Sequence, residues 1–173
     1  MSPRSSASPS DPVERVILGI DPGTAVTGFG VVGRELSGTL RLVACGAIRT
    51  SARAPLATRV HEIFASVLEL VESHRPHAMA VEDVFQGKNV RSALTLGHAR
   101  GVILLAGSLH GVPVAEYAPR QIKSAVAGSG NATKDQVSFM VMKHLRLAEP
   151  PTPADAADGV AAAICHATIG DLP

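Results

Sequence analysis

The chain has 173 residues, of which 46% are hydrophobic and 18% are charged, and its formal net charge is +1. This composition is typical of a globular protein, and the length suits one domain with a sizeable core rather than two ordinary ones. It excludes a disordered chain, and no run of sequence approaches the ~20 apolar residues of a membrane span. With no tryptophan and one tyrosine, the core is expected to be aliphatic.

The first 14 residues, "MSPRSSASPSDPVE", are rich in serine and proline and contain no apolar segment. They predict a disordered tail rather than a secretory signal, followed by a single domain over residues 15–173. The two cysteines, Cys45 and Cys165, are far apart and form neither a metal-binding pair nor a disulfide framework. We therefore expect buried, reduced thiols in a cytoplasmic protein.

Charge is unevenly distributed along the chain. Residues 85–146 contain eight basic and two acidic residues, whereas the last 27 residues contain four acids and no Lys or Arg. A basic middle followed by an acidic end suits a polyanionic ligand held against a group of carboxylates. Taken alone, the charges fit chance clustering on a solvated face equally well.

Hydrophobic periodicity predicts five strands and five helices. The strands are expected at 16–20, 27–32, 40–48, 78–81 and 112–117, and the helices at 55–73, 90–110, 119–127, 133–147 and 153–169. Thr133 and Gln136 form a capping box for the fourth helix, while Thr152 and Pro153 are predicted as the cap and first residue of the last helix. This order predicts an α/β fold: a five-stranded mixed sheet with helices on both faces.

Four carboxylates stand at positions that favour a common site. Asp21 and Glu82 end the first and fourth predicted strands, and they meet at one edge if those strands are neighbours. Asp155 and Asp158 are three residues apart near the start of the last helix, and therefore share one of its faces. Such a group repels itself unless divalent cations balance it, and hard oxygen ligands favour Mg²⁺ or Mn²⁺. Two such ions, ~4 Å apart, stabilise the attacking and leaving oxygens of phosphodiester hydrolysis.

Each acid also has a purely structural explanation. Asp155 would lie at the third position of its helix, where Thr152-x-x-Asp155 resembles a capping box. Asp158 would then be an ordinary acid near a helix N-terminus, and Asp83 an acid on the opposite face of its strand from Glu82. The occurrence of all four acids together favours the metal site.

Four segments, in this order, resemble the RuvC family of Holliday junction resolvases: "GIDPGTAVTGFGVV", "VEDVFQGKNVRSALTLGHARG", "YAPRQIKSAVAGSGNATKDQV" and "PADAADGVAAAICH". The resemblance extends from Val16 to about His166. It implies a ribonuclease H-like fold, a homodimer, and a metal-dependent endonuclease that makes paired symmetric nicks in four-way DNA junctions during recombination and repair. It also implies junction-binding and branch-migration proteins of the same system as partners.

The resemblance assigns residues as well. The catalytic, metal-binding acids that it implies are Asp21, Glu82, Asp155 and Asp158. The aromatic residue that stacks on bases near the crossover falls on Phe85, and the two DNA-contacting lysines fall on Lys123 and Lys134. The residues themselves agree, since an exposed Phe85 is a candidate stacking platform, although it could equally fold back on the core. A phosphate track is expected to comprise Lys88, Arg91, Arg120, Lys123 and Lys134.

The long predicted helix over residues 90–110 is the candidate dimer interface. Its small residues Ala93, Gly97 and Gly101 recur every four positions and permit close helix approach, and the apolar area is expected from Leu94, Leu104 and Leu105. The alternative is that this helix only covers the sheet.

Two other functions remain open from the residues. "DPGTAVTGFGVV" also resembles the first phosphate loop of actin-like ATPases and sugar kinases, but those proteins need a second lobe, and the chain has no second loop of that kind. The other alternative is a catalytically idle DNA-binding module. A nicking assay with and without Mg²⁺ separates all three functions.

Overall fold

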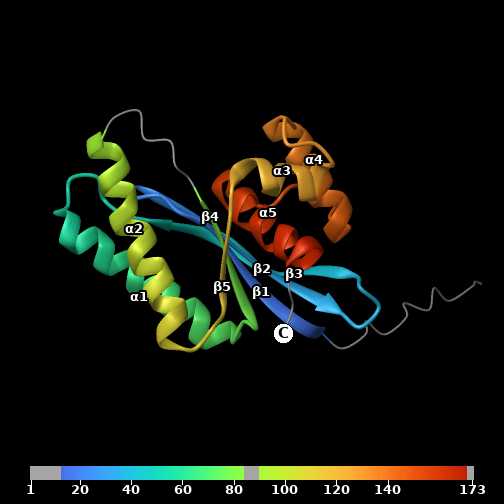
Figure 1. Cartoon of the computed structure of the whole chain (residues 1–173), viewed down its shortest axis with the longest axis horizontal. Helices are drawn as coiled ribbons and strands as arrows, with labels where there is room; N and C mark the ends of the chain where they lie inside the picture. The colour runs from blue at the N-terminus through green and yellow to red at the C-terminus, as the bar shows by residue number, and fades with distance from the viewer. Residues whose placement is uncertain (1–12, 84–89, 171–173) are drawn as a thin grey trace, which may run out of the picture.

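A computed structural model describes residues 13–83 and 90–170 (Figure 1). Its sheet has the strand order β3-β2-β1-β4-β5. The strands are β1 (Val13–Asp21), β2 (Val26–Glu35), β3 (Leu40–Arg49), β4 (Ala78–Glu82) and β5 (Val114–Tyr117). The first three form an antiparallel meander, whereas β1, β4 and β5 run parallel to one another.

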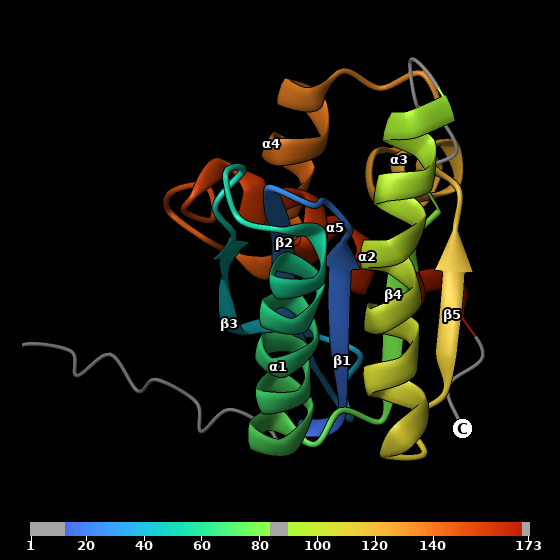
Figure 2. The same cartoon turned by 90° about the vertical axis from the view of Figure 1, so that its left-hand side faces the viewer.

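The helices are α1 (Leu56–His74), α2 (Val90–Leu109), α3 (Pro119–Ala127), α4 (Lys134–Leu145) and α5 (Ala154–Ile169). Figure 2 shows α1 and α2 on one face of the sheet and the three later helices on the other. The predicted five-stranded mixed sheet with helices on both faces is therefore confirmed.

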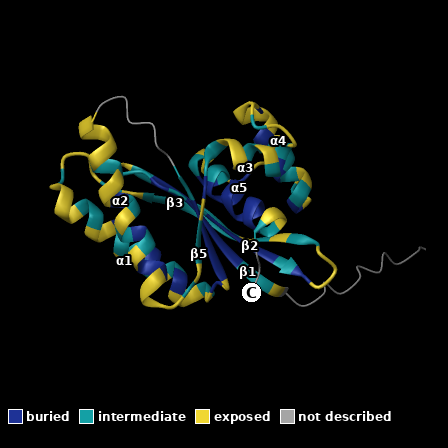
Figure 3. Cartoon of the chain, in the orientation of Figure 1, coloured by how far each residue is buried: buried dark blue, intermediate teal, exposed yellow. Residues whose placement is uncertain are grey.

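The core lies on both sides of the sheet and is aliphatic, as predicted. Because side chains alternate along a strand, Ile17 packs towards α5 while its neighbour Leu18 packs towards α1 and α2. Figure 3 shows that the buried residues follow the central strands and most of α5. Cys165 is fully buried, but Cys45 is only half-buried, and both thiols are free.

Glycines let α5 approach the sheet closely. A Cβ added at Gly19 would lie 2.1 Å from the carbonyl oxygen of Gly159, and one added at Gly28 would lie 1.9 Å from that of Asp155. No side chain fits in either space, so α5 rests directly on the backbone of β1 and β2. This contact brings the N-terminal turns of α5 to the edge of the sheet where β1 ends.

Several predicted boundaries differ from the structure. The N-cap of α5 is Pro153 and no side chain caps it, so the capping role predicted for Thr152 is wrong. The carbonyl of Thr152 instead accepts a hydrogen bond from the Cys45 thiol at 3.7 Å. Helix α4 ends at Leu145 because Arg146 adopts a left-handed conformation, with φ of 53°. Strand β1 begins at Val13, two residues before the predicted start of the domain, and residues 1–12 lie outside the described part.

Helix α2 is, among the described helices, the one that is long and apolar enough to cross a membrane by length and composition. The sequence analysis had predicted no segment of this kind. Arg100, in the middle of α2, forms ion pairs with Asp83 at 2.9 Å and with Glu116, and α2 packs along α1 over the sheet. This pairing turns the Asp83 side chain towards α2, so it lies on the opposite face of the strand from the Glu82 side chain, as expected.

Candidate active site

Asp21 and Glu82 lie side by side at the carboxyl ends of β1 and β4. Ile20 pairs with Val81 in the parallel register, so the next residue of each strand reaches the same edge. The two carboxyl groups hydrogen-bond to each other. Burial, reinforced by the charge of Asp21, raises the pKa of Glu82 to about 8. Burial and then the charge of Asp158 raise the pKa of Asp21 to about 6. Near neutral pH, Glu82 therefore keeps its proton and donates a hydrogen bond through it to the Asp21 carboxylate.

Asp158 joins this pair from α5. Lys134 Nζ donates a hydrogen bond to Asp158 Oδ2 at 2.8 Å, and this bond raises the pKa of Lys134. Lys134 is the first residue of α4, whose start is fixed by the predicted capping box. Thr133 Oγ1 accepts from the Gln136 backbone N–H at 3.2 Å, and Gln136 Oε1 accepts from the Thr133 N–H at 2.8 Å. The capping box is therefore confirmed, and it anchors the lysine beside the acids.

Asp155 has a different partner from the one expected. Its carboxylate accepts a hydrogen bond from Arg49 Nη2 at 3.0 Å and caps no backbone group among the described residues. Arg49 is the last residue of β3, so the pair joins two elements that are far apart in the chain. No local pattern marks Arg49, and the sequence analysis missed it for that reason.

The turn between Asp21 and β2 is held from two sides. Thr27 Oγ1 donates to the carbonyl of Gly23 at 2.6 Å. Arg59, on α1, donates through Nη2 to the carbonyl of Thr24 at 2.6 Å and through Nε to Thr50 Oγ1 at 3.1 Å. The sequence patterns did not indicate Arg59 either. Its two hydrogen bonds hold the backbone that follows Asp21.

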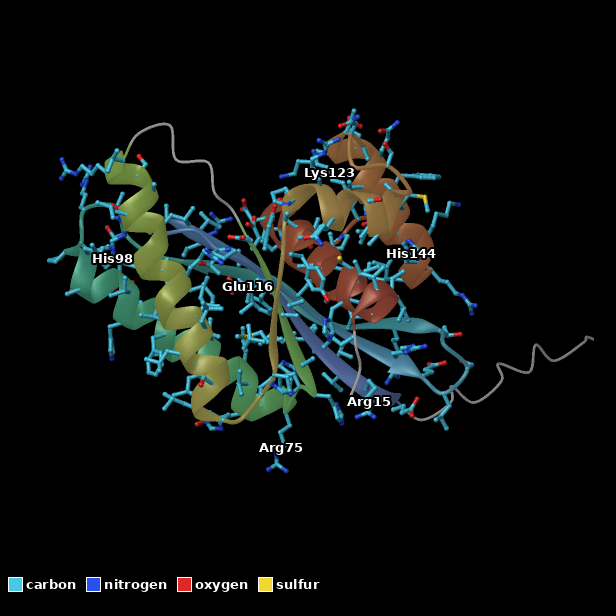
Figure 4. All side chains as sticks on the ribbon, viewed as in Figure 1. Arg15, Arg75, His98, Glu116, Lys123 and His144 are labelled. Atoms are coloured by element: carbon cyan, nitrogen blue, oxygen red, sulfur yellow. The ribbon has the colours of Figure 1, made fainter. Side chains whose placement is uncertain are left out.

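A cavity of about 180 Å³ opens beside these acids. Its polar lining comes from Glu82, Lys123, Lys134 and Asp158. Lys123, labelled on α3 in Figure 4, partly offsets the raised pKa of Glu82 through its positive charge. The cavity therefore combines two acids with two lysines, which suits a phosphate group held next to carboxylates.

The remaining predicted residues lie farther out. Arg120 is exposed on α3 and donates to Asn131 Oδ1 at 3.4 Å, and Arg91 is exposed in the first turn of α2. Neither of them lines the cavity. Phe85 and Lys88 lie outside the described residues.

Within residues 13–83 and 90–170, no three Asp, Glu, His or Cys side chains are grouped closely enough to hold a metal ion. Two of the four acids are turned to cations, Asp155 to Arg49 and Asp158 to Lys134. The donor set nevertheless fits a divalent cation. All four candidate ligands are carboxylates, and burial together with the charge of neighbouring acids raises the pKa values of Asp21 and Glu82, an effect that a bound cation would oppose.

The strand order and the strand directions define a ribonuclease H-like fold, with an acidic pair at one edge of its sheet. The family profile described as "Crossover junction endodeoxyribonuclease RuvC" matches residues 17–166. The chain belongs to this family. That membership leaves no support for the ATPase alternative.

The relatives agree over nearly the whole chain. The crossover junction endodeoxyribonuclease RuvC of Pelotomaculum thermopropionicum is 50% identical over 153 residues, covering 88% of this chain and 92% of the relative. The solved structure of Thermus thermophilus RuvC in complex with a Holliday junction substrate has a TM-score of 0.84 and 41% identity, covering 90% of this chain and 94% of that one. The yeast mitochondrial Holliday junction resolvase Ydc2 shares the fold alone, with a TM-score of 0.66 at 13% identity.

Proposed function

We propose that the protein is a structure-selective endonuclease that resolves four-way DNA junctions by paired symmetric nicks, in homologous recombination and DNA repair. One observation carries the proposal. Within a chain of the RuvC family, β1 and β4 bring Asp21 and Glu82 into contact, and the close packing of α5 adds Asp158 to the same cavity edge. The relative solved with a Holliday junction substrate supports the choice of DNA structure.

We infer that Asp21, Glu82, Asp155 and Asp158 hold two divalent ions, Mg²⁺ or Mn²⁺. Membership of this nuclease family implies dependence on a divalent metal. When bound, such ions supply Lewis-acid stabilisation of the attacking and leaving oxygens. The chain itself contributes the half-buried carboxylates, whose ionised form a cation stabilises, and the two lysines of the cavity, which orient a phosphate beside them.

The DNA contacts are proposed around the acids and on both faces of the sheet. Lys123 and Lys134 lie at the acids, Arg120 extends the basic surface on α3, and Arg91 lies in the first turn of α2 on the opposite face. Phe85 and Lys88 follow Glu82 closely in the chain, and we retain them as the stacking residue and a further phosphate contact. Aromatic stacking suits a crossover whose bases must be held unpaired.

A homodimer is proposed through α2, which has an exposed apolar stripe. Val90, Leu94 and Leu105 are 77%, 62% and 49% exposed, and Cβ atoms added at Gly97 and Gly101 would meet only open space. Of the other predicted interface residues, Ala93 is exposed and Leu104 packs against the core. A two-fold dimer through this stripe supplies the second acidic site that paired nicking requires.

We further propose a cytoplasmic protein whose residues 15–173 form one nuclease domain. Its proposed partners are four-way junction DNA and the junction-binding and branch-migration proteins of the same system.

Cleavage of a synthetic four-way junction beside a linear duplex, in Mg²⁺ and in Mn²⁺, tests the proposal. We expect paired nicks in the junction and an intact duplex. Junction binding without metal-dependent cleavage would instead identify an idle DNA-binding module.

A further inference from the structure

We propose that an open hollow at the far end of the sheet binds the phosphate backbone of a duplex arm of the junction. The proposal rests on the proposed function. The hollow has a volume of about 610 Å³ and lies between the β2–β3 turn and the C-terminal ends of α4 and α5. Its polar lining includes Arg34 from β2, Ser37 and Thr39 from the turn, and Lys143 and Arg146 from the end of α4.

The charge of this hollow is one-sided. Arg34, Lys143 and Arg146 line it, and no acidic residue does so in the described part of the chain. None of the three takes part in an ion pair between described residues, in contrast to Arg49, Arg100 and Lys134. Three cations beside two hydroxyl groups are what a phosphodiester backbone requires.

The end of a helix explains only part of this charge. Lys143 lies in the last turn of α4 and Arg146 directly after it, where cations offset the partial negative charge of the helix C-terminus. Arg34 comes from a different element, and no helix end accounts for it. His144 is already engaged with the carbonyl of Val126 at 2.9 Å and is therefore not one of the proposed phosphate contacts.

The distance from the active site suits an arm that leaves the crossover. Asp21 pairs with Gly28, and Arg34 is six residues farther along β2, which is about 20 Å at ~3.3 Å per residue. Along a separate path, α4 begins at Lys134 beside Asp158 and ends near Arg146, which is about 18 Å at ~1.5 Å per residue. Lys123 and His144, labelled in Figure 4, lie near the two ends of this second path.

These lengths correspond to about six base pairs at ~3.4 Å per pair. Helix α4 therefore links the hollow to the active-site residue Lys134, and the hollow is within reach of the arm next to the crossover. One duplex arm is long enough to contact both ends of this helix, which favours DNA over an acidic protein as the occupant.

The test compares the double variant Arg34→Gln/Arg146→Gln with the control Arg41→Gln/Arg75→Gln, which loses the same charge. Arg75 matches Arg146 because each has a positive φ directly after a helix. Arg41, on β3, pairs with Gly33 of β2, the neighbour of Arg34. Because side chains alternate along a strand, Arg41 lies on the opposite face of the sheet from Arg34. Binding to a junction with 20-bp arms is measured by fluorescence anisotropy over 50–200 mM salt. A second junction carries uncharged methylphosphonates about five to eight base pairs from the crossover.

We expect the slope of log K against log[salt] to become shallower by about 2 in the test variant and to change less in the control. Between 50 and 200 mM salt the wild type should then lose about tenfold more affinity than the test variant. The methylphosphonates should weaken wild-type binding and leave the test variant unaffected. Equal salt slopes for the test and control variants would overturn the proposal. So would a loss of affinity on the methylphosphonate junction that is the same for the wild type and the test variant. Thermal unfolding confirms that both variants are folded. The proposed function is tested separately, since the salt slopes of binding do not depend on cleavage. It would be overturned if the wild type failed to cleave the junction.

Discussion

Arg49, at the end of β3, donates a hydrogen bond to Asp155 in the first turn of α5 at 3.0 Å. The pair replaces the helix-capping role that the sequence had suggested for this aspartate. Both side chains are about half exposed, so the pair adds little to the free energy of unfolding. Its main effect is on the site: the Arg49 guanidinium is paired with a carboxylate that we propose as a ligand of a divalent ion.

Replacing Arg49 with Gln should therefore strengthen Mn²⁺ binding. An exposed ion pair contributes ~0.2–1 kcal/mol, so we expect the dissociation constant to fall by up to about fivefold. Titration followed by electron paramagnetic resonance measures free Mn²⁺ directly. Arg53→Gln, an exposed change in the β3–α1 loop, is the matched control. Weaker binding in Arg49→Gln would show instead that the arginine holds Asp155 in place for the ion.

Asp21→Asn, Glu82→Gln and Asp158→Asn should each lower junction cleavage at least ~10²-fold under single-turnover conditions, the scale of losing one preorganised electrostatic group. Junction binding should persist or tighten, because each change removes one negative charge close to phosphate. Asp135→Asn, an exposed acid in the first turn of α4, is the control and should cut normally. An acid whose amide variant keeps wild-type cleavage does not belong to the site.

The metal-free protein should lose stability as pH rises from about 4 to about 8. Folding raises the pKa of Asp21 to about 6 and that of Glu82 to about 8, so over this range the folded state binds more protons than the unfolded state. The free energy of unfolding then falls with increasing pH. Urea denaturation at several pH values should show this slope, and Glu82→Gln should reduce it. Saturating Mn²⁺ should stabilise the protein more at pH 8 than at pH 5, since it binds the ionised acids. If the free energy of unfolding of the metal-free protein did not change with pH, the pKa values of Asp21 and Glu82 would not be raised by folding.

The sequence predicted the sheet, its helices and the acids because these depend on short-range patterns. Apolar alternation and turn residues marked the strands, and Thr133 and Gln136 marked the start of α4. The acids were found because Asp21 and Glu82 each end a buried strand. Once β1 and β4 pair, their convergence is geometric necessity.

The long-range side-chain contacts could not be predicted in this way. Arg49 meets Asp155 across 106 positions of sequence, and Arg59 reaches Thr24 across 35, so neither contact has a local signature. The start of α5 was misplaced for a related reason. Thr152 has the sequence features of an N-cap, but its carbonyl is used by Cys45 of β3, and the helix begins one residue later.

Lys123→Ala should weaken junction binding equally at all DNA sequences and reduce the slope of log K against log[salt] by ~1, because it removes one phosphate contact. Lys134→Ala should do the same and should also free Asp158 from its 2.8 Å ion pair. Arg75→Ala, whose side chain lies at the opposite end of the molecule from Lys123 in Figure 4, is the control. An unchanged slope would place the lysine off the DNA.

The last prediction concerns the dimer through α2. A four-way junction has approximate two-fold symmetry, and resolving it takes two nicks, whereas one chain supplies one set of acids. Replacing Gly97 with Arg should leave the chain folded, because a Cβ at this position meets open space in the protomer. It should nevertheless prevent close approach of a second α2 helix. We expect a protein that elutes as a monomer and nicks junctions without resolving them. Ala65→Arg, which adds the same charge on the exposed side of α1, should remain a dimer and resolve normally. Paired nicking by a wild-type protein that sediments as a monomer at micromolar concentration would exclude this arrangement.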